Sequence, residues 1–157
     1  MDAGGVSEGS GGAEPPMIDP GEFSALVAEA TDDQLADGFA ANREQLLGEI
    51  FSRMPDRFNP DRARGVEGIV EWRILDRPDG GHDSFRVVIE DGACRVEQGP
   101  AEDPSVTYEI APVDFVKLVT GNASGPKLFL FGRLKIRGNL LLAARMQTIF
   151  SIPQSSR

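Results

Sequence analysis

The sequence predicts an α+β fold, one sheet with helices packed on a face, and three observations support this prediction. Apolar residues recur every three or four positions before residue 55 and again after residue 112, which is the helical period. Between residues 66 and 110 they alternate with polar residues, as in strands that have one buried face. At 157 residues, with 40% hydrophobic and 26% charged residues, the chain has the composition of a soluble globular protein with one domain.

The N-terminal part predicts a tail followed by two helices. Residues 1–18 are rich in Gly and poor in large apolar side chains, so we expect a disordered acidic tail. A short helix over residues 19–30 begins with an N-cap aspartate and a proline. The capping box Thr31-Asp32-Asp33-Gln34 opens a longer helix, which we expect to end at Met54 because Pro55 follows.

The middle of the chain predicts four strands. The first three are joined by tight turns at Pro78–Gly81 and Asp91-Gly92, so they should form an antiparallel meander with one buried face. On the first strand we expect Trp72 on the apolar face and Glu71 on the other face. The four predicted strands are 66–74, 85–90, 94–97 and 106–110.

The last third returns to helical patterns, with one interruption. Pro112 can start a helix, and residues 121–126 break it. The run Leu128–Phe131 is apolar without alternation, and residues 134–137 form a short alternating strand. Asn139 can cap a final helix that extends to Phe150.

Charge is distributed unevenly along the chain, whose net charge is −9. Residues 1–42 hold nine acidic and no basic residues, whereas the chain from Phe115 onward holds seven basic and no acidic ones. This separation argues against nucleic-acid binding, which needs a basic face across the domain. The basic third could contact an acidic partner or, transiently, an anionic membrane surface, although solvated charges are the more ordinary interpretation.

Few residues could support catalysis or hold a cofactor. The single Cys94 excludes an internal disulfide and a cysteine-cluster zinc site, and the single His82 excludes a multi-histidine metal site. We expect His82 to be a solvated turn residue and Cys94 a small core residue. The segment from Gly132 to Gly138 lacks the spacing of a phosphate-binding loop. We therefore predict no catalytic residues, no metal and no cofactor.

The informative feature is the apolar surplus between residues 115 and 150. These side chains could fill a core or surround a cavity, and periodicity alone leaves both interpretations open. A dry cavity of about 300 Å³ would cost roughly 7 kcal/mol, which is comparable with the stability of a whole domain. A cavity of ligand size would therefore tend to be occupied or to collapse.

The C-terminal segment carries a recognisable motif. Phe131-Gly132-Arg133-Leu134-Lys135-Ile136-Arg137-Gly138-Asn139, running into the helix that ends at Met146-Gln147-Thr148-Ile149-Phe150, resembles the C-terminal signature of the sterol carrier protein (type 2) domain family. Upstream, Ile50–Pro55, the strand with Trp72, and Pro112–Phe115 followed by Gly121-Asn122-Ala123 also resemble its bacterial single-domain branch. The resemblance covers roughly residues 35–152.

The resemblance implies a five-stranded sheet covered by helices that enclose an apolar tunnel for a sterol, fatty acid or acyl-CoA. We expect a single domain over residues 19–152 and a flexible end over 153–157. Residues 1–30 fall outside the usual domain of that family, so the helix over 19–30 is an addition that could plug or cover the tunnel. The residues on which we place the tunnel lining are Trp72, Phe115, Leu118, Val119, Phe129, Leu134, Ile136, Leu142, Met146 and Phe150.

We therefore expect a non-catalytic, cytoplasmic carrier of a lipid-like ligand, a monomer or weak dimer that binds no nucleic acid. A rival hypothesis is an enzyme or biosynthetic accessory that holds a polyketide-like or acyl intermediate in the same pocket, using the few nearby polar groups. Those groups are Tyr108, Asn139, Arg145 and Thr148. A third hypothesis is an interaction module with a collapsed cavity and an exposed apolar face.

Overall fold

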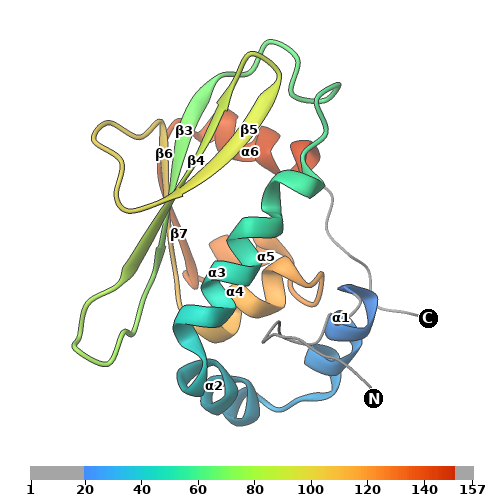
Figure 1. The fold of residues 1–157 in the computed structure, drawn as a ribbon, viewed down its shortest axis with the longest axis vertical. Helices are drawn as coiled ribbons and strands as arrows, with labels where there is room; N and C mark the ends of the chain where they lie inside the picture. The colour runs from blue at the N-terminus through green and yellow to red at the C-terminus, as the bar shows by residue number, and fades with distance from the viewer. Residues whose placement is uncertain (1–19, 151–157) are drawn as a thin grey trace, which may run out of the picture.

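The computed structural model describes residues 20–150, and the predicted tail 1–18 and flexible end 153–157 lie outside this range. The sheet occupies one side of the molecule, and helices α3, α4 and α5 lie together on the other (Figure 1). The predicted α+β class is confirmed. Within the described range, no helix combines the length and the apolar character that a bilayer crossing requires.

The N-terminal part forms three α-helices and one 3-10 turn. They are α1 (Pro20–Glu29), α2 (Asp32–Ala41), α3 (Arg43–Arg53) and η2 (Met54–Arg57). The capping box at the start of α2 is confirmed, because the Gln34 N–H donates to Thr31 Oγ1 over 3.1 Å and the Thr31 N–H donates to Gln34 Oε1 over 2.9 Å.

The prediction of one long helix after Thr31 was wrong, because the chain breaks at Asn42. The Asn42 side-chain amide donates to the carbonyl of Gly38 over 3.4 Å, and its backbone N–H donates to the carbonyl of Phe39 over 3.1 Å. Arg43 then reaches the end of the sheet, where its guanidinium donates to the Ile74 carbonyl and to Asp83, each over 2.7 Å. This long-range contact redirects α3, and no local pattern could have predicted it.

The sheet has five strands in the order β5-β4-β3-β6-β7. Their ranges are β3 Gly68–Ile74, β4 Asp83–Glu90, β5 Ala93–Gln98, β6 Val106–Ile110 and β7 Leu134–Gly138. The predicted meander is confirmed, since β3 pairs with β4 and β4 with β5 in antiparallel register. β6 pairs with β3 in parallel and with β7 in antiparallel register, which makes the sheet mixed.

Three helices complete the C-terminal third: α4 (Pro112–Val119), α5 (Gly125–Leu130) and α6 (Leu140–Ile149). The apolar run at 128–131, predicted without regular structure, belongs mostly to α5, whose first turn is capped by Ser124 Oγ accepting from the Lys127 N–H over 3.3 Å. The predicted cap of α6 is confirmed, because Asn139 Oδ1 accepts from the Leu142 N–H over 3.0 Å.

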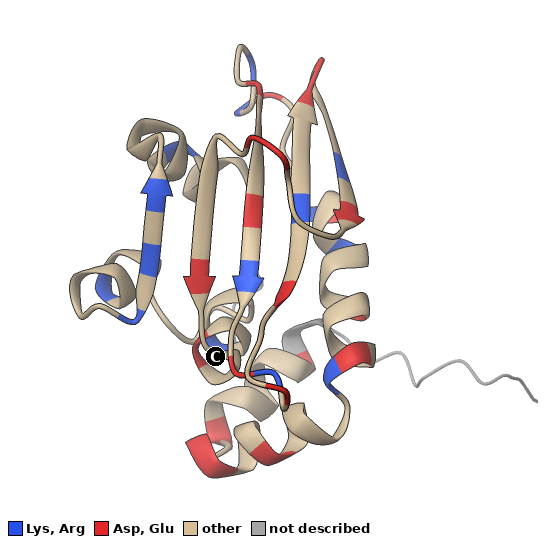
Figure 2. Cartoon of the chain, turned by 90° about the vertical axis from the view of Figure 1, so that its left-hand side faces the viewer, with Lys and Arg blue, Asp and Glu red and all other residues tan. Residues whose placement is uncertain are grey.

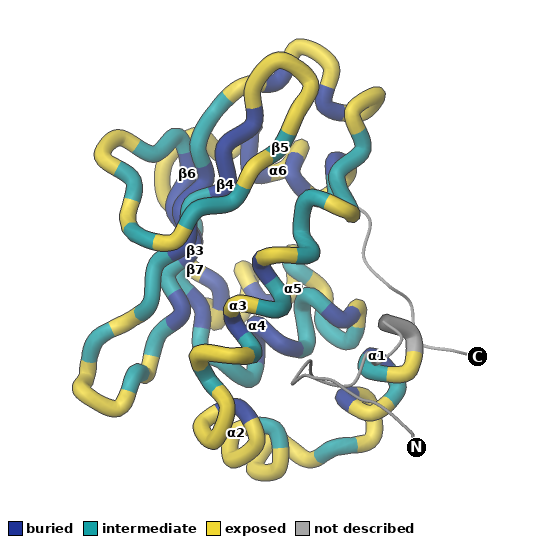
Figure 3. The backbone as a smooth tube through the Cα atoms, viewed as in Figure 1, coloured by how far each residue is buried: buried dark blue, intermediate teal, exposed yellow. Residues whose placement is uncertain are grey.

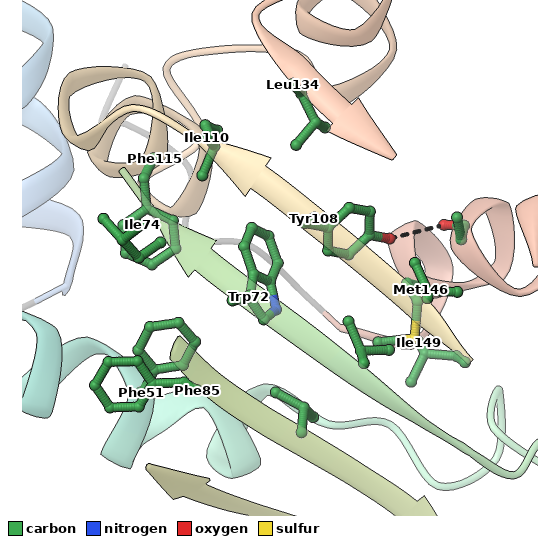
Figure 4. Close-up of a cluster of buried hydrophobic side chains, with 14 of the residues drawn as sticks. Phe51, Trp72, Ile74, Phe85, Tyr108, Ile110, Phe115, Leu134, Met146 and Ile149 are labelled. Carbon is green, nitrogen blue, oxygen red and sulfur yellow. Dashed lines mark hydrogen bonds between the residues drawn. The ribbon is translucent and has the colours of Figure 1, made fainter. Parts of the chain in front are cut away.

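The core lies between the sheet and the helices, as the buried segments in Figure 3 and the side chains in Figure 4 show. Its centre is an aromatic cluster in which Phe51 of α3 stacks on Phe85 of β4 (ring centroids 4.1 Å apart) and on Phe115 of α4 (5.4 Å). The rings of Trp72 and Phe115 meet edge to face, with their centroids 5.5 Å apart. Aromatic pairs of this kind fix the distance between α3, α4 and the sheet.

The other face of the sheet is partly buried, contrary to the prediction of a single buried face. The Glu71 side chain is 1% exposed and accepts hydrogen bonds from Arg73 Nε (2.8 Å) and from the N–H of Ala101 (3.0 Å) in the β5–β6 connection. Burial acts to raise the pKa of Glu71, but the bonds from Arg73 and Ala101 outweigh it and lower that pKa below its usual value. The buried carboxylate therefore ties the β5–β6 connection to the sheet.

Candidate functional site

A cavity of about 830 Å³ lies between the inner face of the sheet and the surrounding helices. Trp72 of β3, Tyr108 of β6 and Leu134 and Ile136 of β7 line it on the sheet side. Helices α3, α4, α5 and α6 supply the rest of the wall, and Phe23 brings α1 to it as well. The volume is within the range of small-molecule sites, about 300–1,000 Å³. The apolar surplus of the sequence therefore surrounds a hollow as well as filling a core.

Eight of the ten residues predicted to line an apolar tunnel do line this cavity. They are Trp72, Leu118, Val119, Phe129, Leu134, Ile136, Met146 and Phe150. Trp72 and Tyr108 face each other on neighbouring strands with ring centroids 4.5 Å apart, and both lie on the face that the helices cover (Figure 4). The alternation of β3, β6 and β7 explains why these side chains share a face.

Phe115 and Leu142, the other two predicted residues, are not among the cavity-lining residues. Phe115 is fully buried and its ring packs against those of Phe51 and Trp72. Leu142 packs over Gly68, where an added Cβ would lie 2.9 Å from Leu142 Cδ2. Both side chains support the wall from behind, and a hydrophobic pattern cannot separate a supporting residue from a lining one.

Polar side chains also line the cavity along α3 and η2, and the expected lining did not include them. Gln45, Glu49 and Arg53 of α3 line it together with Asn42 and Arg57. Arg53 pairs with Glu49 over 3.1 Å, whereas Arg57 forms no ion pair with any residue in the range 20–150. The sequence does contain a pattern that could have predicted these polar lining residues. Gln45, Glu49 and Arg53 follow one another at intervals of four and therefore share one side of a helix, next to the apolar Leu46 and Ile50.

Helix α1 is held beside this cavity by polar contacts to the segment after α4. Ser24 Oγ donates to the Thr120 carbonyl, and the Asn122 side-chain amide donates to the Ser24 carbonyl over 2.9 Å. Both Phe23 and Thr120 line the cavity. The additional helix of the sequence analysis thus contributes to the wall.

The polar groups considered for catalysis do not converge in the cavity. Only Tyr108 lines it; its hydroxyl donates to the Ala143 carbonyl over 3.4 Å (dashed in Figure 4), and burial raises its pKa to about 12. Asn139 caps α6, Arg145 donates to the Arg62 carbonyl, and Thr148 donates to the Arg145 carbonyl.

The lone histidine and the lone cysteine do not line the cavity. His82 is exposed at the β3–β4 hairpin, as predicted. Cys94, which we expected in the core, is only half-buried on β5 and packs against the core from its margin; burial raises the pKa of its thiol to about 11. Within residues 20–150, no group of three or more His, Cys, Asp or Glu side chains could hold a metal ion.

Known proteins resemble this chain in sequence and in fold. The profile of the SCP-2 sterol transfer family matches residues 47–151. The chain is 29% identical over 115 residues to the oleate-induced peroxisomal protein POX18 of Candida maltosa, which covers 73% of this chain and 89% of that protein. It is 25% identical over 131 residues to sterol carrier protein 2 of Rattus norvegicus, covering 83% of this chain but only 23% of that relative.

A solved structure shares the fold. The solution structure of palmitated SCP2L2 from Aedes aegypti matches with a TM-score of 0.54 and 20% sequence identity, over 70% of this chain and 96% of that one. These relatives are eukaryotic, so the bacterial branch named in the sequence analysis stays a prediction.

Proposed function

The chain belongs to the SCP-2 sterol transfer family, and on that premise we propose that it binds a lipid-like ligand reversibly in the cavity and carries it without catalysing a reaction. The observation that supports this proposal most is the cavity itself, which the predicted apolar side chains line. The palmitated neighbour supports an acyl chain as one ligand class. This chain covers only 23% of the rat relative, and we do not extend to it any activity of the remaining part of that protein.

The expected affinity suits a carrier. Burying roughly 400 Å² of apolar ligand surface contributes about 10 kcal/mol, and association costs about 4 kcal/mol or more. The difference corresponds to a dissociation constant in the micromolar range or weaker. A ligand bound with this affinity stays on the protein during transport and can still dissociate.

We further propose that the ligand is an anionic amphiphile whose head group lies beside Arg57 of η2, which lines the cavity. Arg57 is half-buried and has no ion-pair partner among residues 20–150. An unpaired guanidinium beside an apolar hollow favours a carboxylate or phosphate. An acyl chain would then lie along the apolar wall formed by α5, α6 and β7.

Binding of a fluorescent fatty acid to delipidated protein tests the cavity assignment. Val119→Trp should fill part of the cavity and weaken binding at least about tenfold, since the ligand loses wall contacts. Val113→Trp is the matched control, because Val113 is a half-buried residue of the same helix that does not line the cavity. Equal binding by both variants, or no binding of fatty acid and sterol probes by the parent protein, would contradict the proposal.

A pair of ligands tests the head-group assignment. Arg57→Gln should lower the affinity for palmitate roughly fivefold or more, because a charge-assisted hydrogen bond is lost. The affinity for hexadecanol, which has the same chain and no charge, should change less than twofold. An equal loss for both ligands would show that Arg57 does not recognise the anionic group.

A further inference from the structure

Exposed apolar side chains concentrate around β7. Six large apolar side chains are exposed within the described part of the chain, and five of them lie between residues 129 and 141. They range from 47% exposed at Phe129 to 81% exposed at Leu141. Phe129 and Leu130 end α5 and Phe131 follows it, whereas Leu140 and Leu141 start α6 after β7. We name the segment that contains them, residues 126–141, the β7 rim. Exposed apolar side chains at both ends of one edge strand indicate an interaction surface, whereas single exposed leucines need no explanation.

The β7 rim borders the mouth of the cavity. Phe129, Leu130 and Leu140 are exposed and also line the cavity, so the cavity reaches the surface between them. Phe131 and Leu141 are exposed but do not line it. A surface that covers the rim would therefore also face the opening through which an apolar ligand leaves.

The charges of the β7 rim are all positive, in a chain whose net charge is −9. Arg133 pairs with Asp114 over 2.8 Å, and Arg137 lies 3.9 Å from Glu109. Lys127 and Lys135 are exposed and form no ion pair within residues 20–150. In Figure 2 the outermost strand on one side of the sheet carries basic residues and no acidic one, whereas acidic residues gather on other elements.

We propose that the β7 rim docks on the surface of an anionic phospholipid bilayer, with the mouth of the cavity turned toward the lipid. This inference rests on the proposed function, since a carrier must exchange its ligand with a membrane. Apolar side chains such as Phe131 and Leu141 can enter the boundary between head groups and acyl chains, while Lys127 and Lys135 of the same segment attract anionic lipids. Apolar insertion alone and electrostatic attraction alone each bind a membrane weakly, and the two together give reversible attachment.

Vesicle cosedimentation of the full chain without added ligand tests the proposal. We expect binding to mixed phosphatidylcholine/phosphatidylglycerol vesicles, and weaker binding to phosphatidylcholine alone. Binding should also weaken in about 1 M salt, where screening acts within ~3 Å. Lys135→Glu should lower the affinity about fivefold or more, the contribution of one basic residue near such a surface. The double variant Phe131→Ser/Leu141→Ser should lower it at least about tenfold.

Two matched controls separate these effects from general surface changes. Arg95→Glu reverses an exposed charge on β5, the opposite edge of the sheet, and Leu26→Ser removes the one large apolar side chain exposed outside the rim among the described residues. Both should bind vesicles within twofold of the parent. Losses as large as those of the rim variants would overturn the proposal.

Fatty-acid binding in vesicle-free solution distinguishes this inference from the proposed function. Ligand binding without vesicle binding would overturn membrane docking and leave the carrier intact. Vesicle binding without ligand binding would support docking and refute the carrier. A concentration-dependent dimer that disappears in Phe131→Ser/Leu141→Ser, together with no vesicle binding, would overturn docking in favour of self-association.

Discussion

Replacing Gly138 by alanine should destabilise the protein severely, because the added Cβ has no room. Gly138 ends β7 opposite Val106 of β6 and has a φ of +101°, which residues with a Cβ rarely adopt. An ideal Cβ there would lie 2.3 Å from the carbonyl oxygen of Ser105. A backbone atom cannot rotate away as a side chain can, so β6 and β7 would have to separate.

The cost has three sources. A positive φ costs about 1–2 kcal/mol for a residue with a Cβ, and overpacking costs about 1–3 kcal/mol. Separation of the strands would also strain the bond in which the Asn139 N–H donates to the Ser105 carbonyl over 2.9 Å, and a hydrogen bond contributes about 1 kcal/mol. The expected loss is roughly 3–6 kcal/mol, a large share of the 5–15 kcal/mol by which domains are stable.

Gly132→Ala is the matched control, measured by urea denaturation beside Gly138→Ala. Gly132 also has a positive φ, +77°, but an added Cβ there meets no atom within 4 Å. Alanine should therefore cost only the backbone strain, about 1–2 kcal/mol. Free energies of unfolding that fall within about 0.5 kcal/mol of each other for the two variants would refute the close approach of β7 to Ser105.

Three further predictions concern single residues. Glu71→Gln should lower the free energy of unfolding at pH 7 by about 2 kcal/mol. Because the native pKa of Glu71 is lowered, the stabilisation by its carboxylate is present above the unfolded pKa of about 4.3 and is lost as the pH falls through the native pKa. A difference in unfolding free energy between variant and parent that did not shrink in acid would contradict this. Asn139→Ala should lower the free energy of unfolding, measured by heat or urea, by about 1 kcal/mol because α6 loses its N-cap. An unchanged free energy of unfolding would mean that the cap hydrogen bond contributes nothing. Burial raises the pKa of the Cys94 thiol to about 11. Cys94 should therefore react with iodoacetamide at pH 7.5 at least about tenfold more slowly in the folded protein than in the urea-unfolded chain. Equal rates would show that burial does not protect the thiol.

The sequence alone determined features that depend on neighbours in the chain. The strands at β3 to β7, the capping box at Thr31 and the cap at Asn139 follow from alternation and from side chains that bond to their own turn. The motif that spans β7 and the start of α6 also predicted the family, because its glycines and basic residues are neighbours in the chain and can be recognised without knowledge of the fold. Gly138 in that motif meets the Ser105 carbonyl, which gives one physical reason for its place there.

Only the tertiary structure decided which apolar residues face a hollow and which polar ones are buried. Phe115 and Leu142 have the same pattern as Leu118 and Met146, yet the first two pack behind the wall and the last two line the cavity. Periodicity specifies which side of an element is buried, but the depth of each side chain depends on the element opposite. The break at Asn42 and the buried Glu71 have the same origin, since Arg43 finds its partners 31 and 40 residues away and Glu71 bonds to a backbone N–H 30 residues away.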